Sequence, residues 1–207
     1  RRDALMTDGT VVEGESHIPE AHKQIRRVSL HPRHAAPVQS ALDAILNADI
    51  ILLGPGSLYT SIMPNLLVDG VADALRQSRA IKESSAPCMY ICNVMTQPGE
   101  TDGYTASRHV KAILDHAGKG VVDYVLVNAA KVPTQTAQAY AAQGSYPVPV
   151  DDAALNQLGV GVISADIVSA TDPGHHDPGK LTRQVMELLE TLRSSESTGH
   201  SFTLVPR

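Results

Sequence analysis

Four short runs of mostly apolar residues, each bounded by glycine, proline or polar residues, stand out along the chain. They occupy residues 49–54, 88–94, 121–128 and 160–168. Continuous apolar runs of this length are typical of strands that are buried on both faces of a parallel sheet. We therefore expect four strands of one sheet at these positions.

Helical patterns lie between and after these runs. In residues 102–118, apolar side chains recur three and four positions apart, and Gly118 provides a natural helix end. In residues 176–193, Asp177 can cap a helix that begins at Pro178. Shorter helices are expected at 37–48, 70–78 and 134–144. This alternation predicts an α/β fold with a mainly parallel sheet.

Weaker patterns mark the remaining segments. Residues 8–16 alternate weakly and residues 24–30 form a second β-like run, and together they predict a small hairpin or sheet edge. The proline-containing segment 146–151 predicts a short edge strand. The polar connection 82–88 is expected to be a surface loop. Residues 194–207 end in "LVPR", half of a thrombin-cleavage linker, and predict a disordered tail or linker remnant after a folded part at 1–193.

Composition narrows the classes of function. The 207 residues are 43% hydrophobic, with a formal net charge of −5, which argues against a nucleic-acid or anionic-membrane partner. The apolar runs are far shorter than the roughly 20 residues of a membrane-spanning helix. Cys88 and Cys92 would lie about 13 Å apart along one strand, too far for a disulfide, and reduced thiols fit a cytoplasmic protein.

Candidate chemistry follows the first predicted strand, because ligands of open α/β sheets bind beyond the carboxyl ends of strands. In "GPGSLYTS", Gly54 and Gly56 allow close backbone approach, and the amides of Gly56, Ser57 and Leu58 can converge on an anion. The hydroxyls of Ser57 and Ser61 can also donate. The motif is neither a Walker loop nor Gly-x-Gly-x-x-Gly, so a tight strand-to-helix turn remains the alternative.

A second polar loop, "NVMTQPGETDGYT", follows the next strand. Its hydrogen-bonding side chains are Asn93, Thr96, Gln97, Glu100, Thr101 and Asp102. Amides and hydroxyls suit sugar hydroxyls or base edges better than metals, although Glu100 or Asp102 could instead cap the next helix. Two such loops at neighbouring strand ends predict a pocket.

A third candidate is the pair His175 and His176, which indicates a solvated turn, a contact to phosphate or a contact to the sheet edge. The sequence contains no Gly-x-Ser-x-Gly elbow and no His-Glu-x-x-His motif. It therefore indicates no catalytic nucleophile and no general base.

Long segments of the chain resemble the gluconeogenesis factor family, a bacterial branch of the 2-phospho-L-lactate transferase superfamily. They are "GPGSLYTSIMPNLLVDGVADAL", "YICNVMTQPGETDGYTASRHVKAIL", "DGTVVEGESHIP" and "HDPGKLTRQVMELL". The resemblance implies a Rossmann-like three-layer fold, a cytoplasmic location and a homodimer. It also implies a regulatory protein that binds UDP-N-acetylglucosamine without turning it over. Such a protein supports cell shape during gluconeogenic growth, and cell-wall regulatory proteins are the partners implied.

The chain also departs from the family pattern. The family's opening Gly-Gly-Gly-Thr-Gly loop and its Asp-Asp-Gly-Gly-Ser segment do not occur here. We therefore expect the C-terminal two-thirds of a family member, which lacks the first nucleotide-binding βα unit. Family members often carry Arg where this chain has His175, whereas Tyr140 matches a tyrosine implicated in binding the nucleotide sugar.

The resemblance leaves a second function open. The related transferases move a phospholactyl group in coenzyme F420 synthesis. A transferase of this type often uses Mg²⁺, and Glu100 or Asp102 would then be the metal contacts in this chain.

Overall fold

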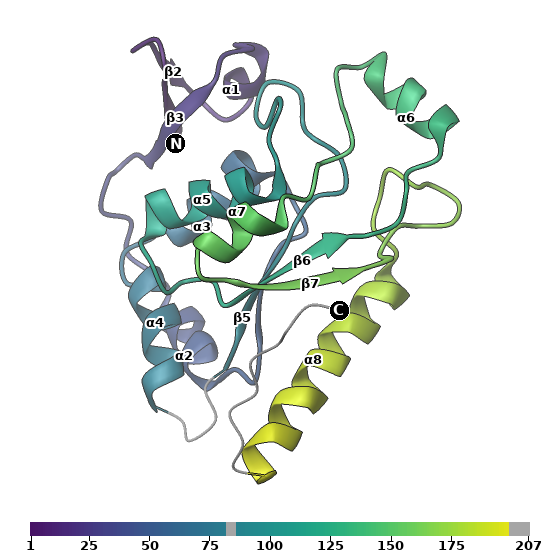
Figure 1. Cartoon of the computed structure of the whole chain (residues 1–207). Coiled ribbons are helices and arrows are strands. Elements are labelled where there is room, and N and C mark those ends of the chain that lie inside the picture. The colour runs from purple at the N-terminus through teal and green to yellow at the C-terminus, as the bar shows by residue number, and fades with distance from the viewer. Residues whose placement is uncertain (82–85, 199–207) are drawn as a thin grey trace.

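The main sheet of the protein has four parallel strands. In a computed structural model of the chain, which describes residues 1–81 and 86–198, the strand order is β4-β5-β6-β7 (Figure 1). The bounds are β4 Ile51–Leu53, β5 Cys88–Ile91, β6 Tyr124–Asn128 and β7 Gly161–Ala165. The α/β class and the parallel sheet expected from the apolar runs are thus confirmed.

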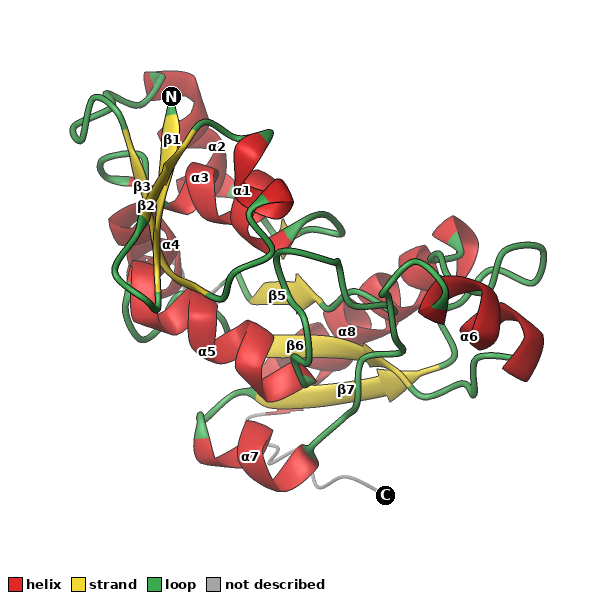
Figure 2. Cartoon of the chain, turned by 90° about the horizontal axis from the view of Figure 1, so that it is seen from above, coloured by secondary structure: helices red, strands yellow, loops and turns green. Residues whose placement is uncertain are grey.

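Helices cover both faces of this sheet, which gives the expected three layers. Helices α5 (Ala106–Ala117) and α7 (Asp152–Gln157) lie on one face and α8 (Pro178–Thr198) on the other (Figures 1 and 2). Each strand lies beside the one before it, in the order β4-β5-β6-β7. Right-handed crossovers between strands added in one direction place their helices on the same face of the sheet, so the opposite face is left for α8. The remaining helices are α1 His17–Glu20, α2 Gln39–Asn47, the π-helix η1 Leu58–Ile62, α3 Met63–Leu66, α4 Val71–Ile81 and α6 Thr134–Ala141.

Strand β5 explains why its sequence reads as one apolar run. Cys88 and Tyr90 pack into the cluster on the α5 side, whereas Met89 and Ile91 pack into the cluster with α8. Side chains alternate between the faces of a strand, so burial of both faces requires apolar residues at every position. In β4 the expectation of burial on both faces is wrong, because Leu52 is 42% exposed at the edge of the sheet.

The N-terminal residues form a second sheet, which is antiparallel. Its strands are β1 Arg2–Met6, β2 Val11–Glu13 and β3 Ile25–Leu30, in the order β2-β1-β3. The two segments that were expected to pair with each other instead pair with β1, which the sequence did not indicate. Strand β1 is hard to recognise because a buried acidic residue, Asp3, precedes its apolar side chains.

Three segments at later positions differ from expectation. Instead of the expected strand, residues 146–151 contribute an isolated bridge, in which Pro147 pairs with Met95. Helix α7 begins directly after this segment. Helix α8 runs to Thr198, five residues beyond its expected end. The rest of the expected tail, and residues 82–85 of the expected surface loop, lie outside the described residues. None of the described helices is both long enough and apolar enough to cross a bilayer.

Candidate functional site

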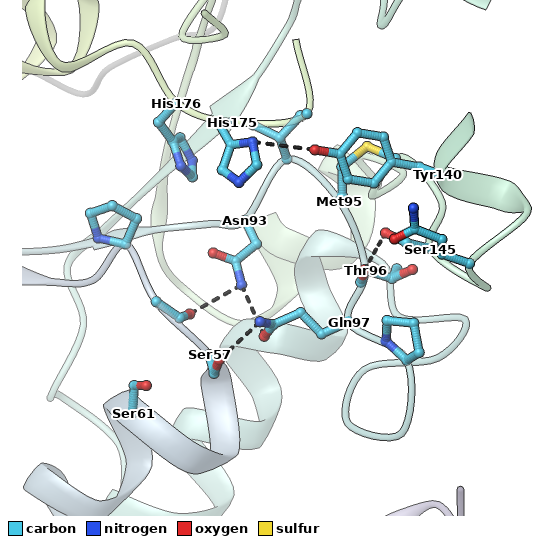
Figure 3. A pocket seen from close by; sticks show the side chains of 16 residues that line it. Ser57, Ser61, Asn93, Met95, Thr96, Gln97, Tyr140, Ser145, His175 and His176 are labelled. Carbon is cyan, nitrogen blue, oxygen red and sulfur yellow. Dashed lines mark hydrogen bonds between the residues drawn. The ribbon is translucent and has the colours of Figure 1, made fainter. Parts of the chain in front are cut away.

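An open pocket of about 650 Å³ lies beyond the carboxyl ends of β4 and β5 (Figure 3). It brings together most of the residues expected from the sequence, namely Gly56, Ser57, Ser61, Asn93, Thr96, Gln97, Tyr140, His175 and His176. Its wall also includes Pro55, Val94, Met95, Pro98, Gln143, Ser145 and Gly174. Five expected residues, Gly54, Leu58, Glu100, Thr101 and Asp102, do not line it.

The loop after β4 is built around a glycine. Gly54 has φ +91°, and a Cβ there would lie 3.3 Å from the carbonyl oxygen of Ile91, so a side chain would be both strained and crowded. Beyond it, the amides of Gly56 and Ser57 donate no hydrogen bond to any residue that the structure describes. These two donors lie at the pocket. Leu58, whose amide was also expected there, does not line the pocket, and its side chain is fully buried in the core.

Side chains from the loop after β5 hold this first loop in place. Asn93 Nδ2 donates to the carbonyl oxygen of Gly56 at 3.0 Å, and Gln97 Nε2 donates to Ser57 Oγ at 2.8 Å (Figure 3). Asn93 Nδ2 also lies 3.4 Å from Gln97 Oε1. Because Ser57 Oγ accepts from Gln97, its own hydroxyl hydrogen remains available to a ligand.

Glu100 connects the same two loops behind the pocket. Its carboxyl oxygens accept from the amide of Tyr59 at 3.1 Å and from the hydroxyl of Thr60 at 2.7 Å. The residue is only 6% exposed. Glu100 therefore satisfies donors at the start of η1, where amides lack partners within the helix.

Thr101 and Asp102 have local roles as well. Thr101 Oγ1 accepts from the amide of Gln97, and Asp102 Oδ2 accepts from the amide of Gly99. The alternative role of Glu100 or Asp102, as a cap of α5, is wrong: the amide of Arg108 donates to Thr105 Oγ1, and Asp151 accepts from Ser107.

A further wall of the pocket comes from pairing with the segment that follows α6. The backbone of Thr96 donates to the carbonyl oxygen of Tyr146 at 2.7 Å, and Tyr146 donates back to Thr96 Oγ1 at 2.9 Å. Ser145 Oγ donates to the carbonyl oxygen of Thr96 at 2.6 Å. This pairing brings Gln143 and Ser145 to the pocket. Sequence reasoning missed both, because the segment carries no periodicity that would reveal its partner.

Tyr140 and the loop after β7 close the opposite side (Figure 3). The Tyr140 hydroxyl lies 3.2 Å from His175 Nδ1. A Cβ on Gly174 would lie 2.2 Å from Tyr140 Cζ, so the ring packs directly on a residue without a side chain. His176 Nε2 lies 3.1 Å from the carbonyl oxygen of Cys92, and burial lowers the pKa of this ring. His176 is therefore neutral at pH 7.

The pocket wall carries no permanent charge in the part of the chain that the structure describes. Its lining residues include no Lys, Arg, Asp or Glu. Mg²⁺ prefers carboxylate oxygens, but Glu100 is engaged by η1 and Asp102 by its own turn. The described residues also hold no cluster of three or more potential metal ligands. These side chains do not fit a Mg²⁺ ion held by the protein itself.

Comparisons with known proteins agree on one family. The family model for the 2-phospho-L-lactate transferase CofD matches residues 2–168. The gluconeogenesis factor of Halalkalibacterium halodurans is 49% identical over 183 residues, which cover 88% of this chain and 55% of the relative. That of Bacillus subtilis is 44% identical over 188 residues, which cover 90% of this chain and 57% of the relative.

A solved structure agrees with the fold. A crystal structure of a UPF0052 family protein from Bacillus halodurans superposes with a TM-score of 0.83 at 46% sequence identity. The match covers 89% of this chain and 57% of that one. The chain thus spans a little over half the length of the relatives that it matches.

Proposed function

The chain belongs to the 2-phospho-L-lactate transferase CofD family, and from this premise we propose that its pocket binds a nucleotide sugar. UDP-N-acetylglucosamine is the ligand to test first, because the resemblance to gluconeogenesis factors implies it. The protein would act as a regulator of cell shape during gluconeogenic growth, by binding the ligand without turnover. A cytoplasmic location, a homodimer and cell-wall regulatory partners belong to the same proposal.

One observation carries this proposal: the chemical character of the pocket wall. Two unengaged amides, of Gly56 and Ser57, suit phosphate oxygens. Hydroxyl, amide and imidazole side chains around them suit a sugar and a base. A volume of about 650 Å³ is also within the usual range of small-molecule sites, which runs from about 300 to 1,000 Å³.

Calorimetry on the full-length protein that carries this chain tests the proposal. We expect UDP-N-acetylglucosamine to bind, and Ser57→Ala to bind it about five- to tenfold more weakly, because one hydroxyl contact and the anchor for Gln97 are lost. Ser40→Ala, at an exposed position of α2, is the matched control and should bind like the wild type. The absence of heat and of a thermal shift at millimolar ligand would reject nucleotide-sugar binding.

The second candidate is a phospholactyl-type transferase, which the match of the CofD family model favours. This reaction needs mainly the positioning of two substrates and the neutralisation of phosphate charge. Release of free nucleotide from its donor substrate, during prolonged incubation with Mg²⁺ and a deazaflavin acceptor, would support the transferase. A nucleotide substrate that stays intact under those conditions would favour binding without turnover.

A further inference from the structure

One carboxylate outside the pocket holds two side chains of its wall. Asp172 Oδ2 lies 2.8 Å from His175 Nδ1, and its Oδ1 accepts from the Tyr140 hydroxyl at 3.4 Å. The loop folds around the same residue, because the amide of His175 donates to the Asp172 carbonyl oxygen at 2.9 Å. Asp172 thus joins the end of α6 to the loop that follows β7, without lining the pocket itself.

This contact decides which ring nitrogen of His175 can meet a ligand. A carboxylate only accepts hydrogen bonds, so Nδ1 carries the hydrogen and donates it to Asp172. In Figure 3, Nδ1 faces the Tyr140 hydroxyl and the other ring nitrogen, Nε2, points away from it into the pocket. Nε2 is therefore the atom of His175 that is offered to a ligand.

His175 differs from the other histidine of the wall in its exposure. Its side chain is 69% exposed, whereas burial lowers the pKa of His176, whose Nε2 is engaged by the carbonyl oxygen of Cys92. The titratable groups that face His175 are Asp172 and His176 from its own loop and Tyr140 from α6. Of these, Asp172 is the acidic side chain, and it accepts the Nδ1 hydrogen of His175.

We propose that Asp172 is a positioning residue for ligand binding, which fixes Tyr140 and directs Nε2 of His175, as an acceptor, at a hydroxyl group of the ligand's sugar. This inference rests on the proposed function, because it concerns the same nucleotide sugar in the same pocket. It adds a contact on the side opposite Ser57 and Ser61 (Figure 3).

The Asp172 carboxylate can be removed without endangering the fold. The side chains of His175 and Asp172 are 69% and 55% exposed, and ion pairs at such positions contribute little to stability. Asp69 and His34 form a similar exposed pair at 3.3 Å in another part of the chain. Asp69→Asn is therefore a matched control for Asp172→Asn.

The experiment measures by calorimetry the affinity of the full-length protein for UDP-N-acetylglucosamine and for uridine. Asp172→Asn should bind the nucleotide sugar about tenfold more weakly, because the hydrogen bond to a positioned His175 ring is lost, but should bind uridine with a much smaller change. Asp69→Asn should match the wild type, and Asp172→Glu should recover part of the affinity.

A double variant separates positioning from a merely structural role. If Asp172 acts through His175, His175→Gln should weaken binding of the nucleotide sugar, and Asp172→Asn added to it should weaken binding no further. If wild type binds neither ligand, the proposed function fails. If it binds and Asp172→Asn matches Asp69→Asn in affinity, the role of Asp172 is refuted while the proposed function stands. Should Asp172→Asn melt lower than its control, the double variant decides, and additive losses of affinity overturn the inference.

Discussion

At the scale of single residues, the pocket depends on positions where a side chain is absent. Gly174 lets the Tyr140 ring lie against the backbone, since an added Cβ would come within 2.2 Å of Cζ and 2.3 Å of the hydroxyl oxygen. Real Cβ atoms do not approach other atoms so closely, so the ring would have to move. Its hydrogen bonds to His175 and Asp172 would move with it.

Gly174→Ala should therefore weaken binding of UDP-N-acetylglucosamine roughly three- to tenfold, which corresponds to the usual contribution of a well-placed aromatic contact. Its free energy of unfolding should change by about 1 kcal/mol or less, because Gly174 is only partly buried. Gly179→Ala is the control, because its Cβ would meet one side-chain atom at 3.2 Å outside the pocket. Calorimetry and urea denaturation measure the two effects, and equal affinities in both variants would contradict the role of Gly174.

At the scale of elements, Glu100 ties the start of η1 to the loop that follows β5. Its two oxygens serve two donors, the amide of Tyr59 and the hydroxyl of Thr60. An amide side chain has one oxygen and one NH₂ group, so it cannot accept from both. One donor would remain buried without a partner, which costs about 1–3 kcal/mol.

Glu100→Gln is accordingly expected to lower the free energy of unfolding by about 1–3 kcal/mol, measured by urea denaturation. Glu190→Gln on the exposed side of α8 provides the comparison and should leave stability unchanged. An unfolding midpoint of Glu100→Gln equal to that of Glu190→Gln would show that the two loops do not depend on this carboxyl group.

At the scale of the whole molecule, buried histidines link stability to pH. His109 is fully buried; its Nδ1 donates to the carbonyl oxygen of Thr105, and its Nε2 has no partner among the described residues. Burial lowers its pKa from 6.5 to about 4. His116 Nε2 accepts from the amide of Val28 and joins the antiparallel sheet to α5, and burial lowers its pKa as well.

Both rings are thus neutral when folded, whereas histidines of the unfolded chain gain protons near pH 6.5. Protons then favour the unfolded state, so the stabilisation is complete above about pH 6.5 and declines as the pH falls towards 4. His109→Asn keeps a donor for the carbonyl oxygen of Thr105. It should reduce the loss of unfolding free energy between pH 6.5 and 4 by roughly 3 kcal/mol. His22→Asn, at a position with positive φ, is the control. Denaturation curves across this pH range measure the slope, and an unchanged slope in His109→Asn would exclude His109 as its source.

The sequence predicted the parallel sheet because burial on both faces leaves a continuous apolar run, as in β5. It predicted the end of α5 and the start of α8 because Gly118, Asp177 and Pro178 act locally. It did not predict β1, whose buried Asp3 masks the pattern, or the inward role of Glu100. A polar residue in a loop looks the same in sequence whether it faces a ligand or a helix end.

The layering of the sheet has a consequence for synthesis on the ribosome. The cluster of Met89, Ile91 and Leu126 is completed by side chains of α8, and α8 follows every strand of the sheet along the chain. While the polypeptide emerges, these side chains lack the cover of α8 until that helix has left the exit tunnel. During that interval the nascent chain presents an uncovered apolar surface, the kind that chaperones bind and that aggregation recruits.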